Sequence, residues 1–347
     1  MTGNMLARSS RDVAESRIVA TWLERLGELL ADTHDTLFAE TLRHASISRS
    51  DLDRAEHLTQ RHLDFVLARV RPQIPDITLR LFSRAEVLDL GLVGYAAINS
   101  DTVGDALRVM YEYHSLASDR YTDQIDVEGD FAVIYPIPLP GYADDFQNIC
   151  EDSFSGNWRA MQVLLGPRAD TSRLVLQLEH GRPAYVDTYY DIFGNNCVFE
   201  QEQAAMRFPA AWLDLPVHHG SGALADVYTA MCERVLGPSG ANRDTAQIVR
   251  RLLLSRTGRT MPRLEEAALQ LRLTAGQLRK RLYRAGTSYK QLVLEIRMEL
   301  ARHYLLDTHL SIQEIAYLLD YATPAPFSRA FKSYYGKAPD HYRSSQA

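Results

Sequence analysis

The C-terminal part of the chain repeats one pattern of helices. The segment LEEAALQLRLTAGQLRKRL, which starts at Leu264, aligns with IQEIAYLLDYATPAPFSRAF, which starts at Ile312, with one extra residue in the second turn. Ala268 matches Ala316 in this alignment. Each copy holds two short stretches with apolar residues at helical spacing, separated by a tight turn. The repeat therefore predicts two helix-turn-helix units.

Start signals place the helices of this part. Thr274 with Gln277, and Ser311 with Glu314, have the spacing of a capping box, and a proline after Thr323 suits a first helical position. Between the two copies, apolar residues recur at three- and four-residue steps, which predicts one amphipathic connecting helix. The expected helices are 245–255, 264–271, 275–285, 289–305, 312–319 and 324–335.

Charge divides the chain just before these helices. Residues 245–347 hold 17 Lys and Arg against 8 Asp and Glu, a net charge of +9, whereas residues 1–244 hold 21 against 36, a net charge of -15. A basic segment on an acidic chain suits a polyanion partner, because neutralising phosphates releases counterions. A merely solvated basic face is the alternative interpretation of the charge alone.

The domain boundary is expected at the turn-forming segment 237–242, GPSGAN. We predict a domain over 1–236, a linker over 237–244 and a DNA-binding domain over 245–347. The first domain mixes helical and strand periods, which predicts an α+β fold ahead of an all-α domain with two helix-turn-helix units joined by a linker helix. Its expected elements are helices near 18–30, 58–68, 102–117 and 147–165, and strands at 131–135 and 174–178.

Helical periodicity assigns an inner and an outer face to the second helix of each unit. In 275–285, the inner residues are Leu278, Leu282 and Ala285, the outer ones are Gly276, Arg279, Lys280 and Tyr283, and Gln277 lies at the border. In 324–335, the inner residues are Phe327, Ala330, Phe331 and Tyr334, and the outer ones are Ala325, Ser328, Arg329 and Lys332. Arginine can pair with guanine, an amide with adenine, and an alanine methyl can contact thymine in the major groove. The alternative is an ordinary polar helix face, with Arg281 as a phosphate contact or a structural cation, and with Arg284, Lys290 and Arg297 as solvated charges.

Residues 248–343 resemble the DNA-binding domain of the AraC/XylS family of bacterial transcription regulators. The resemblance rests on the run FSRAFK at 327–332 with Gly336, Pro339, Tyr342 and Arg343. It implies reading positions at Gly276, Gln277, Arg279, Lys280, Pro324, Ala325, Ser328, Arg329 and Lys332. The family usually has glycine where this chain has Arg272 and Asp320, and a positive φ there would cost on the order of 1 kcal/mol each.

Residues 20–230 resemble, more loosely, the arabinose-binding-like effector domain of one branch of the same family. The segments that carry this resemblance are 90–96, 100–107, 198–200 and 206–208. It implies a domain that senses a small-molecule effector or self-associates as a homodimer. Its acidic charge favours a cationic or zwitterionic amine as effector, unless that charge only keeps the domain soluble and away from DNA.

Other classes of protein are not indicated. The chain has no His-Glu-x-x-His, no glycine-rich phosphate loop and no nucleophile elbow, so we expect no enzyme, metal or cofactor. No run approaches the roughly 18 apolar residues of a membrane helix, and we expect a cytoplasmic protein. The leading hypothesis is a sequence-specific regulator that acts on RNA polymerase at a promoter in response to a small molecule. The alternatives are an N-terminal domain that only dimerises or binds a protein, and a non-specific architectural DNA binder.

Overall fold

The computed structural model describes residues 10–32, 34–218, 222–236, 245–254, 261–308 and 310–344. The chain forms two compact units, Met1–Asn242 and Arg243–Ala347. The expected linker, 237–244, lies outside the described residues, so its bounds remain a prediction.

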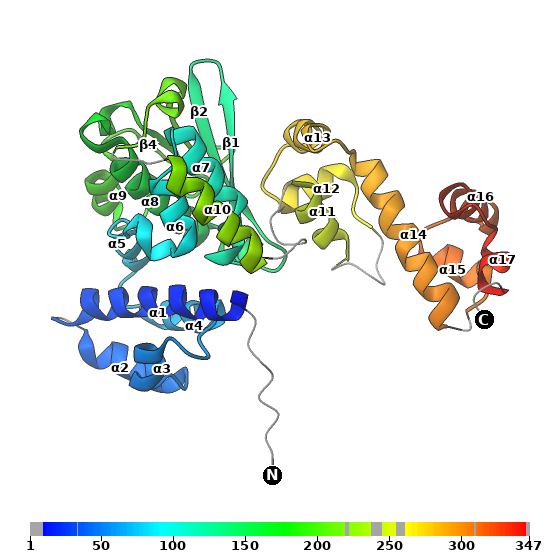
Figure 1. Cartoon of the computed structure of the whole chain (residues 1–347), viewed down its shortest axis with the longest axis horizontal. Helices are drawn as coiled ribbons and strands as arrows, with labels where there is room; N and C mark the ends of the chain where they lie inside the picture. The colour runs from blue at the N-terminus through cyan, green and yellow to red at the C-terminus, as the bar shows by residue number, and fades with distance from the viewer. Residues whose placement is uncertain are drawn as a thin grey trace, which may run out of the picture. The chain divides into compact units, whose positions relative to one another are not determined.

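The N-terminal unit begins with a layer of helices built on the long α1, Ser10–Leu30. Figure 1 shows α1 in dark blue beside the shorter helices, and α1 contacts all four of them. They are α2 (Asp35–His44), α3 (Arg49–Arg54), α4 (Gln60–Val70) and α5 (Ile77–Phe82). Their apolar faces meet in one core that includes Trp22, Leu26, Val66 and Leu67.

The rest of this unit is a sheet with helices packed against it. The strand order is β1-β2-β5-β3-β4, all neighbours being antiparallel except β3 and β4. The strands are β1 (Tyr121–Glu128), β2 (Phe131–Pro138), β3 (Val175–Gln177), β4 (Cys197–Val198) and β5 (Ala205–Pro209). The helices are α6 (Leu92–Ile98), α7 (Val103–Glu112), α8 (Phe146–Leu165), α9 (Val186–Phe193) and α10 (Gly222–Leu236).

Helix α8 is the centre of the second core. It is buried on nearly every side and contacts α5, α7 and β2, with Trp158 among the largest fully buried side chains. A helix enclosed in this way has no solvent face, so its polar residues must find partners inside the protein. Its buried polar residues include Glu151, Asp152 and Asn157.

The α+β class of the N-terminal unit is confirmed, and several of its elements follow the expected ranges. The predicted helix 147–165 is α8, and the predicted strands are β2 and β3. The predicted helix 102–117 is shorter, because α7 ends at Glu112 and a 3-10 turn, His114–Leu116, follows. Sequence reasoning missed β1, whose polar residues at 123, 124 and 126 interrupt the apolar alternation.

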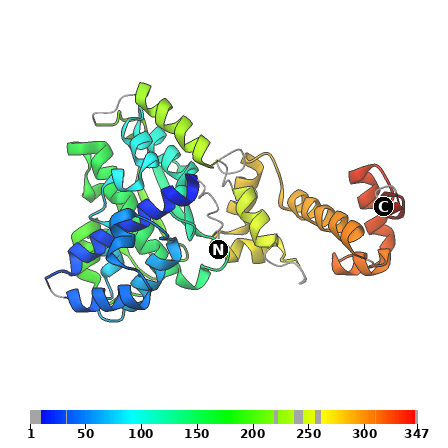
Figure 2. The same ribbon diagram turned by 60° about the horizontal axis from the view of Figure 1, so that its bottom comes forward.

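The C-terminal unit consists of helices in its described residues. They are α11 (Thr245–Leu254), α12 (Leu264–Gln270), α13 (Ala275–Arg284), α14 (Tyr289–Asp307), α15 (Ile312–Leu318), α16 (Pro324–Tyr335) and α17 (Pro339–Ser344). Figure 2 shows α14, in orange, between the two helix-turn-helix units. Both predicted capping boxes are present, at Thr274 and Ser311. The sequence did not predict α17.

Candidate DNA-reading helices and a buried polar cluster

Helix α13 has the two faces that its periodicity predicts. Leu278 and Leu282 are fully buried, whereas Arg279 and Lys280 are exposed and Tyr283 retains 82% of its accessible surface. The exposed side of α13 therefore presents two cations and a phenol to solvent. These side chains donate hydrogen bonds, and base edges in the major groove and the flanking phosphates provide the acceptors.

Gln277 is engaged with its own helix. Its side-chain Oε1 accepts a hydrogen bond from the backbone N–H of Thr274 over 2.9 Å, and its backbone N–H donates to Oγ1 of Thr274 over 3.2 Å. Pairing with adenine requires the amide oxygen as well as the amide nitrogen. Reading adenine in that way would use the same amide oxygen that the capping box engages.

Helix α16 repeats the arrangement of α13. Phe327 and Phe331 are fully buried. Ala325, Arg329 and Lys332 are exposed, and Pro324 and Ser328 are half-buried at the edge of that face. The inward assignment of Tyr334 was wrong, because 42% of its surface is exposed. The neighbouring Tyr335 packs inward instead, 4.8 Å from the Phe331 ring between centroids, and its hydroxyl donates to the Met298 carbonyl over 3.3 Å.

Several residues behind the family resemblance hold the end of this unit together. Gly336 ends α16 in the left-handed region at φ 76°, where a glycine avoids the Cβ clash. The ring of Tyr342 meets Phe331 edge to face at 5.3 Å. Arg343 donates to the carbonyls of Leu305 and Leu310 over 3.2 and 2.5 Å, which satisfies acceptors near the end of α14. The contacts of Gly336, Tyr342 and Arg343 are therefore structural, whereas Arg329 and Lys332 are exposed cations.

Both turns have a positive φ at the position where the family usually has glycine. Arg272 has φ 53° and Asp320 has φ 60°. The Asp320 carboxylate accepts a hydrogen bond from the Met261 backbone N–H over 2.9 Å and lies 3.5 Å from the Arg297 guanidinium. Arg297 also lies over the Tyr321 ring, at 5.3 Å from its centroid. Arg297 is thus part of the packing rather than the solvated charge expected from the sequence.

A basic hollow of about 560 Å³ adjoins α13. Four of the residues around it are cations: Arg263, Arg279, Lys290 and Arg297. Concentrated positive charge in a concave surface raises the local concentration of anions. The hollow extends the positive surface of α13 toward the start of α14.

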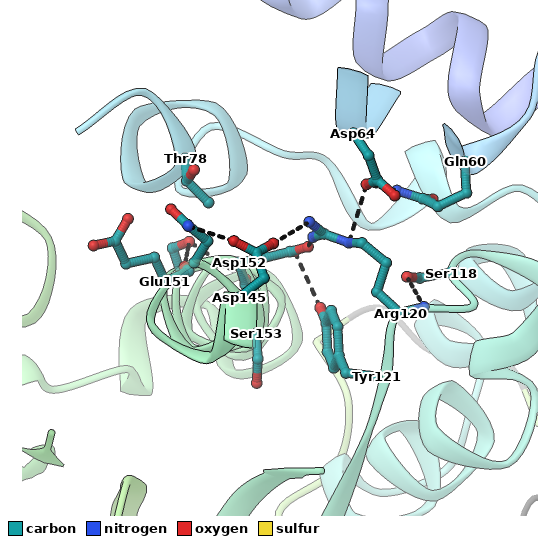
Figure 3. Close-up of polar contacts among 12 residues, drawn as sticks. Gln60, Asp64, Thr78, Ser118, Arg120, Tyr121, Asp145, Glu151, Asp152 and Ser153 are labelled. Atoms are coloured by element: carbon teal, nitrogen blue, oxygen red, sulfur yellow. Dashed lines mark hydrogen bonds and ion pairs between the residues drawn. The ribbon is translucent and has the colours of Figure 1, made fainter. Parts of the chain in front are cut away.

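Arg120 lies at the centre of a buried polar cluster in the N-terminal unit. Only 1% of its side chain is exposed, and its guanidinium is paired with Asp152, 3.5 Å from Asp64 and 3.8 Å from Asp145. Figure 3 shows it between Asp64 and Asp152. Burial by itself would lower the pKa of Arg120, but the surrounding carboxylates raise it above its ordinary value. The cluster links α4 of the first core to α8 and β1 of the second.

Two further buried carboxylates on this side of the sheet have partners from α8 and α9. Asp123 accepts hydrogen bonds from Ser153 over 2.6 Å and Asn157 over 2.8 Å, and burial raises its pKa to about 7. Glu151 accepts from the hydroxyls of Tyr185 and Tyr189 over 2.8 and 3.0 Å, and burial raises its pKa as well. Local sequence patterns do not reveal these pairs, because the partners are more than twenty positions away.

The described residues contain no group of three or more His, Cys, Asp or Glu side chains that could hold a metal ion. In the same part of the chain, no helix combines the length and apolarity needed to cross a membrane. The cysteines at 150, 197 and 232 are buried, and burial raises the pKa of Cys197 to about 12. A thiol with so high a pKa is a poor nucleophile at neutral pH.

Residues 38–217 match the model of the arabinose-binding domain of AraC transcription regulators, and residues 267–345 match a helix-turn-helix domain. The chain belongs to the AraC family of transcription regulators. The ornithine utilization regulator of Pseudomonas aeruginosa is 28% identical, over 84% of this chain and 93% of that protein. The regulator VqsM of the same species is 24% identical, over 77% of this chain and 83% of its own.

Among solved structures, the crystal structure of the regulator CdpR from Pseudomonas aeruginosa is similar. The match covers 89% of this AraC-family chain and 97% of the CdpR chain. Its sequence identity is 22% and its TM-score is 0.42. The two family matches show that the protein is a transcription regulator with a helix-turn-helix DNA-binding domain and an arabinose-binding-like N-terminal domain.

Proposed function

We propose that this regulator reads specific DNA sequences with α13 and α16, each placed in a successive segment of the major groove. The observation that carries the proposal is the matching design of the two helices. In each, buried apolar residues anchor one face, and two cations are exposed on the other: Arg279 and Lys280 in α13, and Arg329 and Lys332 in α16. Two such faces, each following a tight turn, suit base edges and phosphates together.

The proposed reading positions are those that the family resemblance implies: Gly276, Gln277, Arg279, Lys280, Pro324, Ala325, Ser328, Arg329 and Lys332. They are not expected to contribute equally. Gly276 has no side chain to reach a base, and Gln277 is held in its capping box. The second unit should therefore specify more of the sequence than the first.

Regulation by a small molecule completes the proposal. The N-terminal unit would bind the effector, and the DNA-binding unit would then recruit or block RNA polymerase at a promoter in the bacterial cytoplasm. A homodimer would place two such readers on one operator. The alternative is a domain that only self-associates or binds a protein. Heating the full-length protein with a panel of metabolites separates the two, because a ligand that binds the native state alone raises the melting temperature.

DNA reading is tested by comparing Arg329→Ala with Lys280→Ala. An operator is first obtained by genome-wide footprinting, and binding is then measured on a library of operator variants. Arg329→Ala removes a bidentate contact to a base, which should weaken the binding free energy by about 1–3 kcal/mol and relax the preference at one base pair. Lys280→Ala should weaken binding evenly across the library. Equal loss on every variant for Arg329→Ala would make it a backbone contact, and equal binding of operator and random DNA by the wild type would favour an architectural protein.

A further inference from the structure

A pocket of about 340 Å³ in the N-terminal unit lies among segments that are far apart in the sequence. Its walls come from α1, the start of α6, the turn at Leu116 and the end of α10 at Val235. The helices α1, α6 and α10 are labelled in Figure 1, and α10 contacts both α1 and α6. Sites for small ligands have volumes of roughly 300–1,000 Å³, so this pocket is of a suitable size.

One face of α1 supplies much of the lining. The residues on that face are Ser10, Val13, Ala14, Arg17 and Ile18. They recur at steps of three and four, so a single helical stripe faces the pocket. Gly91, with φ 60°, presents no side chain opposite Ile18 and leaves room there. The surface is apolar apart from the Ser10 hydroxyl, the Tyr95 phenol and the Arg17 guanidinium.

The charge at the pocket is positive, although the N-terminal domain as a whole is acidic. Among the described residues that line it, Arg17 is the one that carries a charge, and no carboxylate is present. The neighbours of Arg17 at three- and four-residue steps along α1 are the uncharged Val13, Ala14, Ala20 and Thr21. The nearby Asp89 is engaged by Arg25 at 2.6 Å. An apolar cavity with one exposed guanidinium favours a molecule with an apolar body and an anionic head.

The pocket also has a position from which it can affect α10. This helix stacks Tyr228 on Tyr95 at 5.2 Å between ring centroids, and Glu233 accepts a hydrogen bond from Tyr113 over 3.4 Å. Val235 lines the pocket one residue before the end of α10, and residues 237–244 follow toward the DNA-binding unit. A ligand touching both α1 and Val235 would hold the last turn of α10 in place.

We propose that this pocket binds a small apolar carboxylate, with the carboxylate on Arg17 and the hydrocarbon between α1, α6 and α10. The inference rests on the proposed function and adds the class of effector and its site. The proposed carboxylate replaces the amine that the overall charge of the domain favours. A guanidinium in direct contact with the ligand interacts with it more strongly than distant, screened charges of the domain do.

Calorimetry on the full-length protein tests the proposal with octanoate, 1-octanol and octylamine, which share one chain and differ in head charge. Octanoate should bind saturably, octanol more weakly and octylamine least. Arg17→Gln should weaken octanoate about fivefold and leave octanol unchanged, and Arg17→Lys should restore most of the loss. Arg84→Gln, on an exposed residue away from the pocket, is the matched control and should change nothing.

Ala14→Trp should fill the pocket and abolish binding of both octanoate and octanol, with circular dichroism and melting used to confirm its fold. Octylamine binding as tightly as octanoate, or equal octanoate affinity in the wild type and Arg17→Gln, would overturn the proposal. If another metabolite stabilises the wild type and Ala14→Trp alike, this pocket is refuted while small-molecule control stands. If octanoate binds as expected but operator affinity is unchanged, the site stands and its control of DNA binding is refuted.

Discussion

Glycine substitution at the two helix-turn-helix turns should separate backbone strain from the contribution of side-chain contacts. Arg272 and Asp320 occupy equivalent positions and both have positive φ, at 53° and 60°. Replacing either residue with glycine removes the clash between Cβ and the backbone that this conformation imposes. Asp320 also connects its turn to the chain before α12 and to α14, through Met261 and Arg297.

The expected magnitudes follow from these contacts. At Arg272, relief of the left-handed conformation is worth about 1–2 kcal/mol, and the greater freedom of glycine in the unfolded chain offsets about 0.4–1 kcal/mol of it. Arg272→Gly should therefore stabilise by roughly 0.5–1 kcal/mol relative to Arg272→Ala. At Asp320, the lost hydrogen bond and partly exposed ion pair together cost about 1–2 kcal/mol. Because aspartate tolerates positive φ better than arginine, Asp320→Gly should destabilise by about 1 kcal/mol.

Urea unfolding of residues 243–347 measures these differences, with the full-length chain as a check. The alanine variants are the matched controls, because each removes the side-chain contacts and keeps the Cβ. The reasoning is refuted if Asp320→Gly is at least as stable as the wild type. It is also refuted if Arg272→Gly is no more stable than Arg272→Ala, since the positive φ would then impose no strain.

Three further predictions concern which unit binds DNA and how the buried polar cluster contributes to stability. Residues 237–347 alone should bind the operator with an affinity that falls steeply with salt, and residues 1–236 should not bind; retention of DNA by the latter in a gel-shift assay would contradict this. Asp123→Asn should flatten the pH dependence of stability between pH 4 and 7: burial raises the Asp123 pKa from 3.8 to about 7, so the native chain keeps a proton that the unfolded chain releases, and stability falls as pH rises through this window. A wild-type melting temperature that is constant from pH 4 to 7, or the same slope in Asp123→Asn, would count against it. Arg120→Leu should lower the free energy of unfolding by about 3–5 kcal/mol at pH 7, measured in denaturant, because Asp152 and its neighbours lose their buried counter-ion. This difference from the wild type should shrink at lower pH, as the carboxylates are protonated. A difference below about 1 kcal/mol at pH 7 would show that water screens the cluster.

Local interactions explain why the sequence predicted so much of the C-terminal unit. A capping box joins residues three positions apart, and an apolar stripe repeats within a single helix, so both are visible before any tertiary contact forms. The bounds of α13 and α16, and the exposure of Arg279 and Arg329, follow from such patterns. Tyr334 was misassigned because neighbouring tyrosines lie at the border of the inner face, where periodicity alone does not choose between them.

Tertiary structure decided the features that depend on distant residues. The sheet order, the pairing of Arg120 with Asp152, the Asp320 contact with Met261 and the pocket beside Arg17 each join segments that local periodicity does not connect. Asp123 illustrates the physical reason: in the sequence it is a polar residue that weakens a strand pattern, and in the fold it is buried against Ser153 and Asn157. Composition and periodicity record which faces are apolar, but only packing determines which buried charges meet a partner.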